Sequence, residues 1–216
     1  MYTPSFNAVA DEDEIRAMVA AMRAGWLVTV DTAGFPVATL MPVIWRGRTV
    51  YAHMAKANPH WRQIVPDAPA LVICSGADAY ISPNWYATKL EHGRVVPTWN
   101  YTAVQLTGKV RTHLDPEWLR SMVTELTETH ERLLPHPWKV TDAPDAFIDG
   151  QLNGIVGIEL TVEHFEGKAK LSQNRSEADQ LGVVAGLHAT AHVNPGAHAI
   201  AEAMARAIDA VTGDRT

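Results

Sequence analysis

The chain has a single cysteine among its 216 residues, and this excludes covalent stabilisation within the chain. One thiol forms no intrachain disulfide, and no second thiol is present to hold a zinc ion beside it. Cys74 lies in the apolar run ALVICSG, which predicts a buried thiol on a strand.

The signatures of common nucleotide and hydrolase sites are also missing. There is no G-x-G-x-x-G, and neither Gly108-Lys109 nor Gly167-Lys168 is followed by Ser or Thr. Dinucleotide-binding Rossmann sites and Walker loops are thereby excluded. G-x-S-x-G and H-E-x-x-H are absent too, so a site in this chain must be built from other patterns.

Clusters of positive charge and long apolar runs are lacking as well. The formal charge is -6, and nucleic-acid surfaces normally need a clustered excess of Lys and Arg. No segment has the pattern of a helix-turn-helix with a basic second helix. No apolar stretch is long enough to cross a bilayer, and the first residues do not resemble a signal peptide. We expect a soluble, cytoplasmic protein without a membrane partner, and the charge does not support DNA as a partner.

The apolar residues, 47% of the chain, are sufficient for a core and follow recognisable periods. Strands are predicted over 26–31, 36–45, 49–54, 67–82 and 95–114, with one strand or a pair over 154–171. Helices are predicted over 15–25, with Gly25 as the stop, and over 117–134, 174–187 and 197–211. The Asn58-Pro59 and Asp115-Pro116 pairs are typical helix starts.

This order favours a mainly β protein with peripheral helices, an α+β fold built on an antiparallel β-barrel. We expect one domain over 1–187 and a helical tail over 188–216 packed on it. The proline-rich stretch 135–144 is predicted to be a loop.

Three tryptophans lie in polar, proline-bearing runs instead of apolar ones. The runs are HMAKANPHWR (53–62), YISPNWY (80–86) and VPTWNY (96–101), and GKAKLSQNR (167–175) has the same polarity without a tryptophan. An aromatic plane among Lys, Asn and His suits a flat ligand with polar edges. Together the four runs predict a site for a planar, anionic molecule.

The first run is the strongest candidate for holding a phosphate. Its candidate binding residues are His53, Lys56, Asn58, His60 and Arg62. The run leaves a strand and enters a helix, so free backbone amides and cationic side chains meet in a small volume. A solvated strand-to-helix turn explains the same residues without a ligand.

The two aromatic runs offer planes that proline stiffens in place. Trp85, Tyr86, Trp99 and Tyr101 would be pre-oriented for a ring, which lowers the entropy lost on binding. Aromatic residues beside proline are equally typical of a dimer interface.

The fourth run is dense in hydrogen-bond donors, among them Lys170, Ser172 and Gln173. Amide and hydroxyl groups can contact the pyrimidine edge of a flavin, and a lysine can face a phosphate or a reduced, anionic ring. A strand end followed by a capped helix accounts for the same run without a ligand.

Three histidines near the C-terminus, His188, His192 and His198, have no acidic or thiol co-ligand close in sequence. Asn194-Pro195 interrupts any helix that would align them. Solvated histidines and no metal are the better interpretation.

Taken as a set, MYTPSF and the four polar runs resemble the signature segments of the PaiB family, described as FMN-binding negative transcriptional regulators. The resemblance covers Met1 to about Leu187. It implies an FMN-binding split β-barrel, similar to pyridoxamine 5'-phosphate oxidases, and a homodimer with two FMN sites at the subunit interface.

Position by position, the resemblance implies that Lys56, Asn58 and His60 hold the FMN phosphate and that Trp99, Asn100 and Tyr101 lie along the ring. Lys170, Ser172 and Gln173 would close the site, from the same or the second subunit. Where the related oxidases carry Arg and Lys after the first hairpin, this chain has VATLMPV. The phosphate is therefore expected to bind more weakly or to rely on backbone amides.

Two functions remain open at this point, and whether the protein is an enzyme stays undecided. One is a dimeric FMN-binding regulator that controls transcription directly or through a protein partner. The other is a small FMN-dependent oxidoreductase, either a flavin reductase or oxidase-like. Haem binding through His53 or His164 is a weaker third hypothesis.

Overall fold

A computed structural model of the chain describes residues 1–213. The strands are β1 (Ala8–Val9), β2 (Ala24–Val30), β3 (Pro36–Arg46), β4 (Thr49–Ala55), β5 (Ala68–Ile81), β6 (Thr98–His113) and β7 (Ile155–Lys170). The α-helices are α1 (Glu12–Met22), α2 (Lys89–His92), α3 (Pro116–Glu131), α4 (Asp145–Leu152), α5 (Glu177–Thr190) and α6 (Ala197–Gly213). Short 3-10 turns are η1 (Ser5–Asn7), η2 (Pro59–Gln63), η3 (Pro83–Trp85) and η4 (Val140–Asp142).

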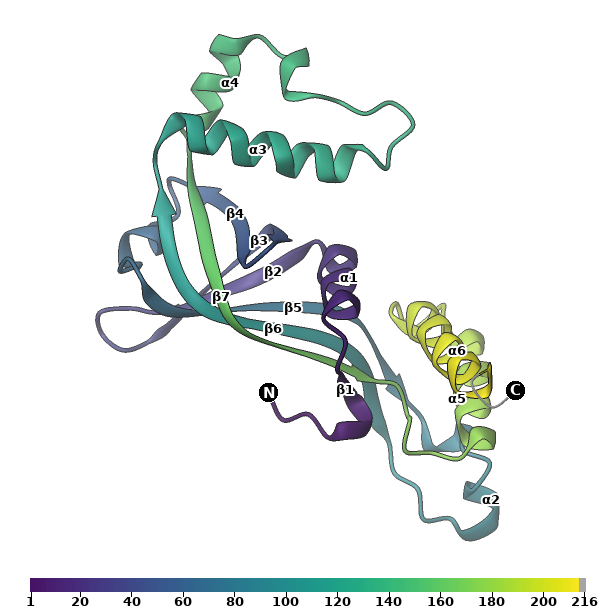
Figure 1. The fold of residues 1–216 in the computed structure, drawn as a ribbon. Helices are drawn as coiled ribbons and strands as arrows, with labels where there is room; N and C mark the ends of the chain where they lie inside the picture. Colours follow the sequence, from purple (N-terminus) through teal and green to yellow (C-terminus); the bar gives the residue numbers. More distant parts are fainter. Residues whose placement is uncertain (214–216) are drawn as a thin grey trace. The chain divides into compact units, whose positions relative to one another are not determined.

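The sheet closes on itself. Its order is β1-β7-β4-β3-β2-β5-β6, and β6 also pairs with β7, so six long strands form a ring and β1 adds two residues to β7 (Figure 1). At Gly108 of β6, a Cβ would overlap the carbonyl of Thr161 in β7, so only glycine allows the two backbones to approach this closely. The antiparallel barrel with peripheral helices is confirmed.

The chain divides into two compact units. The barrel unit comprises Arg16–Cys74 and Gln105–Phe165, and the helical unit comprises Met1–Ile15, Ser75–Val104 and the described part of Glu166–Thr216. Strands β5, β6 and β7 each begin in one unit and end in the other. The division into 1–187 and 188–216 stays a prediction.

The interior of the barrel unit is formed by alternate residues of its strands, as period-two patterning requires. Across β4 and β7, Val50 pairs with Leu160 and Met54 with Val156, and all four are buried. Cys74 is fully buried, and burial raises the pKa of its thiol to about 12. The prediction of a buried strand thiol is confirmed.

The helical unit has a core of its own. Helices α5 and α6 lie side by side (Figure 1) and pack around Ile81, Tyr86 and Leu187. Trp85 rests on α5 at Gly186, where a Cβ would overlap the indole. Tyr86 is 2% exposed, so the prediction that it offers a plane to a ligand is wrong. Its ring packs in the apolar core of the helical unit instead.

Helix boundaries were predicted best where a capping side chain is present. Asp115 accepts a hydrogen bond from the amide of Trp118, and Asn58 caps η2 in the same way. The predicted stop of the first helix at Gly25 is wrong, because α1 ends at Met22 and Arg23 takes the left-handed conformation (φ 62°) that turns the chain into β2.

The short helices α2 and α4 were not predicted. Over residues 1–213, no helix combines the length and the apolar character that crossing a lipid bilayer requires.

Candidate functional site

The phosphate-binding candidates of the first polar run lie in the barrel unit, where β4 passes into η2. A buried hydrogen-bond cluster fixes this turn. The Oδ1 atom of Asn58 accepts from the amide of His60 at 3.0 Å, and its Nδ2 donates to Oγ1 of Thr39 at 3.2 Å. The His60 ring bonds to Thr29 at 2.8 Å through Nε2 and to Thr39 at 2.7 Å through Nδ1.

The His60 side chain is 1% exposed, and burial lowers its pKa. Because both ring nitrogens are engaged by threonine hydroxyls, the ring has no hydrogen bond left for a ligand. Its contribution in this structure is to hold η2 against β2 and β3. Thr29 and Thr39 were missed as members of this cluster, although the inward position of Thr29, two residues from buried Leu27, marks a hydroxyl that needs a buried partner.

Lys56 and Arg62, in contrast, extend from the same turn into solvent. The backbone between them is braced, since Nε1 of Trp61 donates to the carbonyl of Lys56 at 3.0 Å. The Arg62 guanidinium lies over the indole of Trp61, 4.7 Å from the ring centroid. No residue among 1–213 hydrogen-bonds or ion-pairs with Nζ of Lys56. Two cations on a rigid turn suit an anionic group.

His53 has a different environment. It faces Gly157 across the β4–β7 pair, burial lowers its pKa, and its Nδ1 is buried without a hydrogen-bond partner among the described residues. A buried polar atom without a hydrogen bond lowers the stability of the folded protein. A ligand contact for His53 stays a prediction.

The remaining candidates lie in the helical unit, at the start of β6 and the end of β7. Asn100 is fully buried, and its Nδ2 donates to Oγ of Ser172 at 2.9 Å. Ser172 itself has a positive φ of 65°. Gln173 accepts from the amide of Leu171 at 2.7 Å and donates to the carbonyl of Ala169. These three side chains hold the turn after β7 through hydrogen bonds within the protein.

Trp99 and Lys170 are the accessible members of this second group. Trp99 is 51% exposed and meets Tyr80 edge to face, with ring centroids 6.2 Å apart. Lys170 donates from Nζ to the hydroxyl of Thr98 and the carbonyl of Trp99, and burial lowers its pKa, as does neighbouring Lys168 to a lesser degree. Tyr101 lies under Nζ of Lys168, 5.0 Å from the ring centroid.

The candidates thus form two groups, one in each unit. Apart from His53, the amide, hydroxyl and imidazole side chains of both groups form internal hydrogen bonds, while cations and one indole remain accessible. Among the C-terminal histidines, His188 and His198 lie close together, with ring centroids 5.7 Å apart. Within residues 1–213, no group of three metal-ligating side chains is found.

Comparison with solved structures defines the class of the fold. The FAD and heme binding protein from Mycobacterium smegmatis matches with a TM-score of 0.58 at 13% identity, over 81% of this chain and 78% of that one. The flavocytochrome Anf3 from Azotobacter vinelandii matches with a TM-score of 0.54 at 15% identity, over 82% and 75%. The protein has the antiparallel split-barrel fold.

Sequence comparison gives the family. The family described as "Putative FMN-binding domain" matches residues 1–164. The protease synthase and sporulation protein PAI 2 of Bacillus subtilis is 33% identical over 208 residues, which span 94% of this chain and 96% of that protein. The chain therefore belongs to the PaiB family of FMN-binding domain proteins.

Proposed function

We propose that this protein binds FMN and acts, as a cytoplasmic homodimer, in the control of transcription. The observation that carries the proposal is the similarity to the Bacillus subtilis protein along nearly the full length of both chains, together with the family match over residues 1–164. Bound FMN would supply one- and two-electron chemistry, while the protein supplies binding and orientation.

The turn between β4 and η2 fits the phosphate end of FMN. Lys56 and Arg62 are exposed cations on a backbone held by the Asn58–His60 cluster. Since the cluster is already hydrogen-bonded internally, we assign the phosphate contacts to Lys56, Arg62 and the backbone, and a positioning role to Asn58 and His60. This fits a chain in which β3 has VATLMPV where the related oxidases carry Arg and Lys.

The second group fits an aromatic ring. The exposed indole of Trp99, fixed by Tyr80, offers a plane. The Lys170 ammonium is held beside the backbone of Trp99, where it can face the negative charge of a reduced flavin. Asn100, Ser172 and Gln173 hold the backbone that presents these two side chains.

The dimer is supported by an apolar face on the outside of the barrel unit. Trp26 of β2 is the cross-strand neighbour of Leu40 in β3 and of Ile73 in β5. Trp26 and Leu40 are 45% and 53% exposed. Large aromatic and aliphatic side chains gathered on one exposed face are typical of a protein interface.

Flavin titration of the purified protein tests the cofactor. We expect the fluorescence of FMN to fall when it binds. FMN should bind more tightly than riboflavin, because only FMN carries the phosphate. Equal affinity for the two flavins, or a Soret band in place of flavin absorption, would contradict FMN as the cofactor.

The regulatory role is tested by comparing transcript levels in host strains with and without the gene. We expect the wild-type protein to restore the transcript levels of the deletion strain and Trp99→Ala not to restore them.

A further inference from the structure

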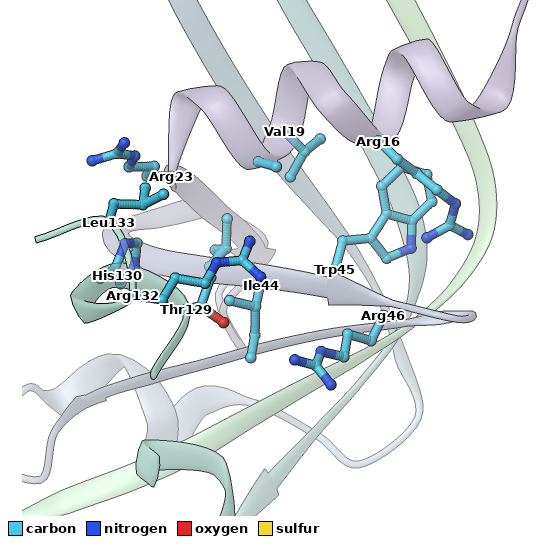
Figure 2. Close-up of a pocket in the computed structure, with 12 residues that line it drawn as sticks. Arg16, Val19, Arg23, Ile44, Trp45, Arg46, Thr129, His130, Arg132 and Leu133 are labelled. Atoms are coloured by element: carbon cyan, nitrogen blue, oxygen red, sulfur yellow. The ribbon is translucent and has the colours of Figure 1, made fainter. Parts of the chain in front are cut away.

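A cavity in the barrel unit is lined by none of the flavin candidates. Its volume is about 250 Å³, and it is lined by residues of α1, the end of β3 and the C-terminal end of α3 (Figure 2). None of its twelve lining residues is acidic, while four are arginines and one is a histidine. Such a concentration of positive charge is unexpected in a chain with a formal charge of -6.

Two of the arginines are held in place by the barrel itself. Arg16 donates from Nη2 to the carbonyl of Gly47 at 2.6 Å, and its guanidinium lies over the ring of Trp45, 3.9 Å from the centroid. Arg46 forms an ion pair with Glu125 of α3. These contacts order one side of the cavity, where Glu125 balances the charge of Arg46.

The other two arginines, Arg23 and Arg132, keep their charge uncompensated. Among residues 1–213, no side chain or carbonyl forms a hydrogen bond or an ion pair with either guanidinium. His130, the last basic residue of α3, also lines the cavity. Unpaired guanidinium groups gathered at one concave surface bind carboxylate or phosphate oxygens through two parallel hydrogen bonds.

The backbone at Arg23 supports a role for this side chain. Arg23 has a φ of 62°, a conformation that glycine adopts without strain and arginine does not. The conformation is fixed by a hydrogen bond from the Arg23 amide to Val19 at 2.9 Å and by one from the Val43 amide to the Arg23 carbonyl at 3.0 Å. The backbone that turns α1 into β2 therefore fixes the point from which the Arg23 side chain extends at the cavity.

The remaining wall is apolar. Val19 of α1 and Ile44 of β3 are buried beneath the cavity, and Leu133 stands at its rim with 61% of its surface exposed (Figure 2). An inorganic ion has no apolar group that could contact this wall. The volume is below that of usual drug-sized sites, roughly 300–1,000 Å³, which favours a small ligand over an extended one.

We propose that this cavity binds a small phosphate monoester, with the dianionic group between Arg23 and Arg132 and the organic part against Val19, Ile44 and Leu133. The site is separate from the flavin candidates and does not depend on the proposed flavin function. The protein would accordingly respond to a second, phosphorylated molecule.

The test is calorimetric titration of the protein, both without flavin and after loading with FMN, with phenyl phosphate and with inorganic phosphate. We expect one phenyl phosphate per chain, with lower affinity at higher salt. Arg23→Gln and Arg132→Gln should each weaken binding by about tenfold or more, the loss expected for a charged hydrogen bond. Arg94→Gln, which changes an exposed arginine of the helical unit, should leave it unchanged.

The ligand classes are distinguished in the same experiment. Phenyl phosphate binding more tightly than inorganic phosphate supports the apolar wall, and equal affinities overturn that part of the proposal. Displacement of phenyl phosphate by FMN would overturn a separate site. Loss of duplex DNA binding in the two variants, with no phenyl phosphate binding to the parent protein, would assign the arginines to nucleic acid instead. Because Arg23 and Arg132 are exposed, unchanged circular dichroism is expected and is checked for each variant.

Discussion

The buried imidazole of His60 couples the stability of the barrel to pH. A neutral ring can donate to one threonine and accept from the other, and protonation would replace the accepted hydrogen bond with a second donor. Burial lowers the pKa of His60, and it lowers the pKa of His53 as well. The folded state therefore favours the neutral form of both histidines.

The sign of the pH dependence follows from these shifts. An unfolded histidine titrates near a pKa of about 6.5, so above this pH neither state binds the proton and the folded state has its full stability. As the pH falls from there toward the lowered pKa values, the unfolded chain binds more protons and stability is lost. We expect the slope of unfolding free energy between pH 6.5 and 5.5, measured with urea, to be smaller in His60→Gln. The slope in His136→Gln, at an exposed position, should match the parent protein; an unchanged slope in His60→Gln would refute the assignment.

Lys56 gives the sharpest test of the phosphate assignment. Its ammonium has no internal partner among the described residues, so Lys56→Ala removes a charge without exposing a buried group. We expect FMN affinity to fall by about tenfold, as for one charged hydrogen bond, and riboflavin affinity to stay the same. Arg94→Ala is the matched control. Equal losses for both flavins would place the phosphate elsewhere.

Residue types in the polar runs predicted where candidate binding groups lie but not which of them are accessible. Lys56, Arg62 and Trp99 are exposed as a site requires, whereas Asn100 is buried against Ser172 and Gln173 bonds to its own turn. The same amide can serve a ligand or the backbone. The three-dimensional course of the backbone decides between these uses, and residue types in a single sequence do not give that course.

At the scale of the element, the contact between α5 and η3 depends on glycine. A Cβ at Gly186 would overlap the indole of Trp85, whereas a Cβ at Gly150 of α4 has no atom within 4 Å. We expect Gly186→Ala to lower the free energy of unfolding by about 1–3 kcal/mol, the usual cost of overpacking. Gly150→Ala should be neutral or stabilise by up to about 1 kcal/mol, because alanine favours helix. Urea unfolding of both variants measures the difference, and equal effects would mean that the contact is not tightly packed.

Elements with long periodic patterns were predictable, and short ones were not. Strands β5, β6 and β7 and helix α3 follow the predicted ranges closely, because each has many alternating or helically spaced apolar residues and α3 has the Asp115 cap. Helix α4 has only eight residues, with Ile148 and Leu152 as its buried positions. Two apolar residues four apart do not distinguish one helical turn from a loop; packing against α3 does.

At the scale of the whole molecule, the distribution of surface residues matters more than the totals. The composition predicted an acidic protein without a nucleic-acid surface, yet a basic cavity and an apolar face both lie on the barrel unit. Neither is visible in the sequence, because the arginines come from three distant segments and the apolar face from three strands. Pairing of β2 with β3 and β5 brings the apolar residues together, and the arginines meet where α1 and the end of α3 line one cavity with β3.

The apolar face leads to a prediction about assembly. If a second copy of the chain covers Trp26 and Leu40, a charge placed there must be desolvated on association, which opposes dimer formation. We expect the parent protein to sediment as a dimer and Leu40→Lys to sediment as a monomer at the same micromolar concentration. Leu90→Lys is the control, since Leu90 of α2 is 93% exposed and belongs to the helical unit. A Leu40→Lys dimer as stable as the parent would exclude this face from the interface. If Leu40→Lys is a monomer, flavin titration of this variant measures whether FMN binding requires both subunits.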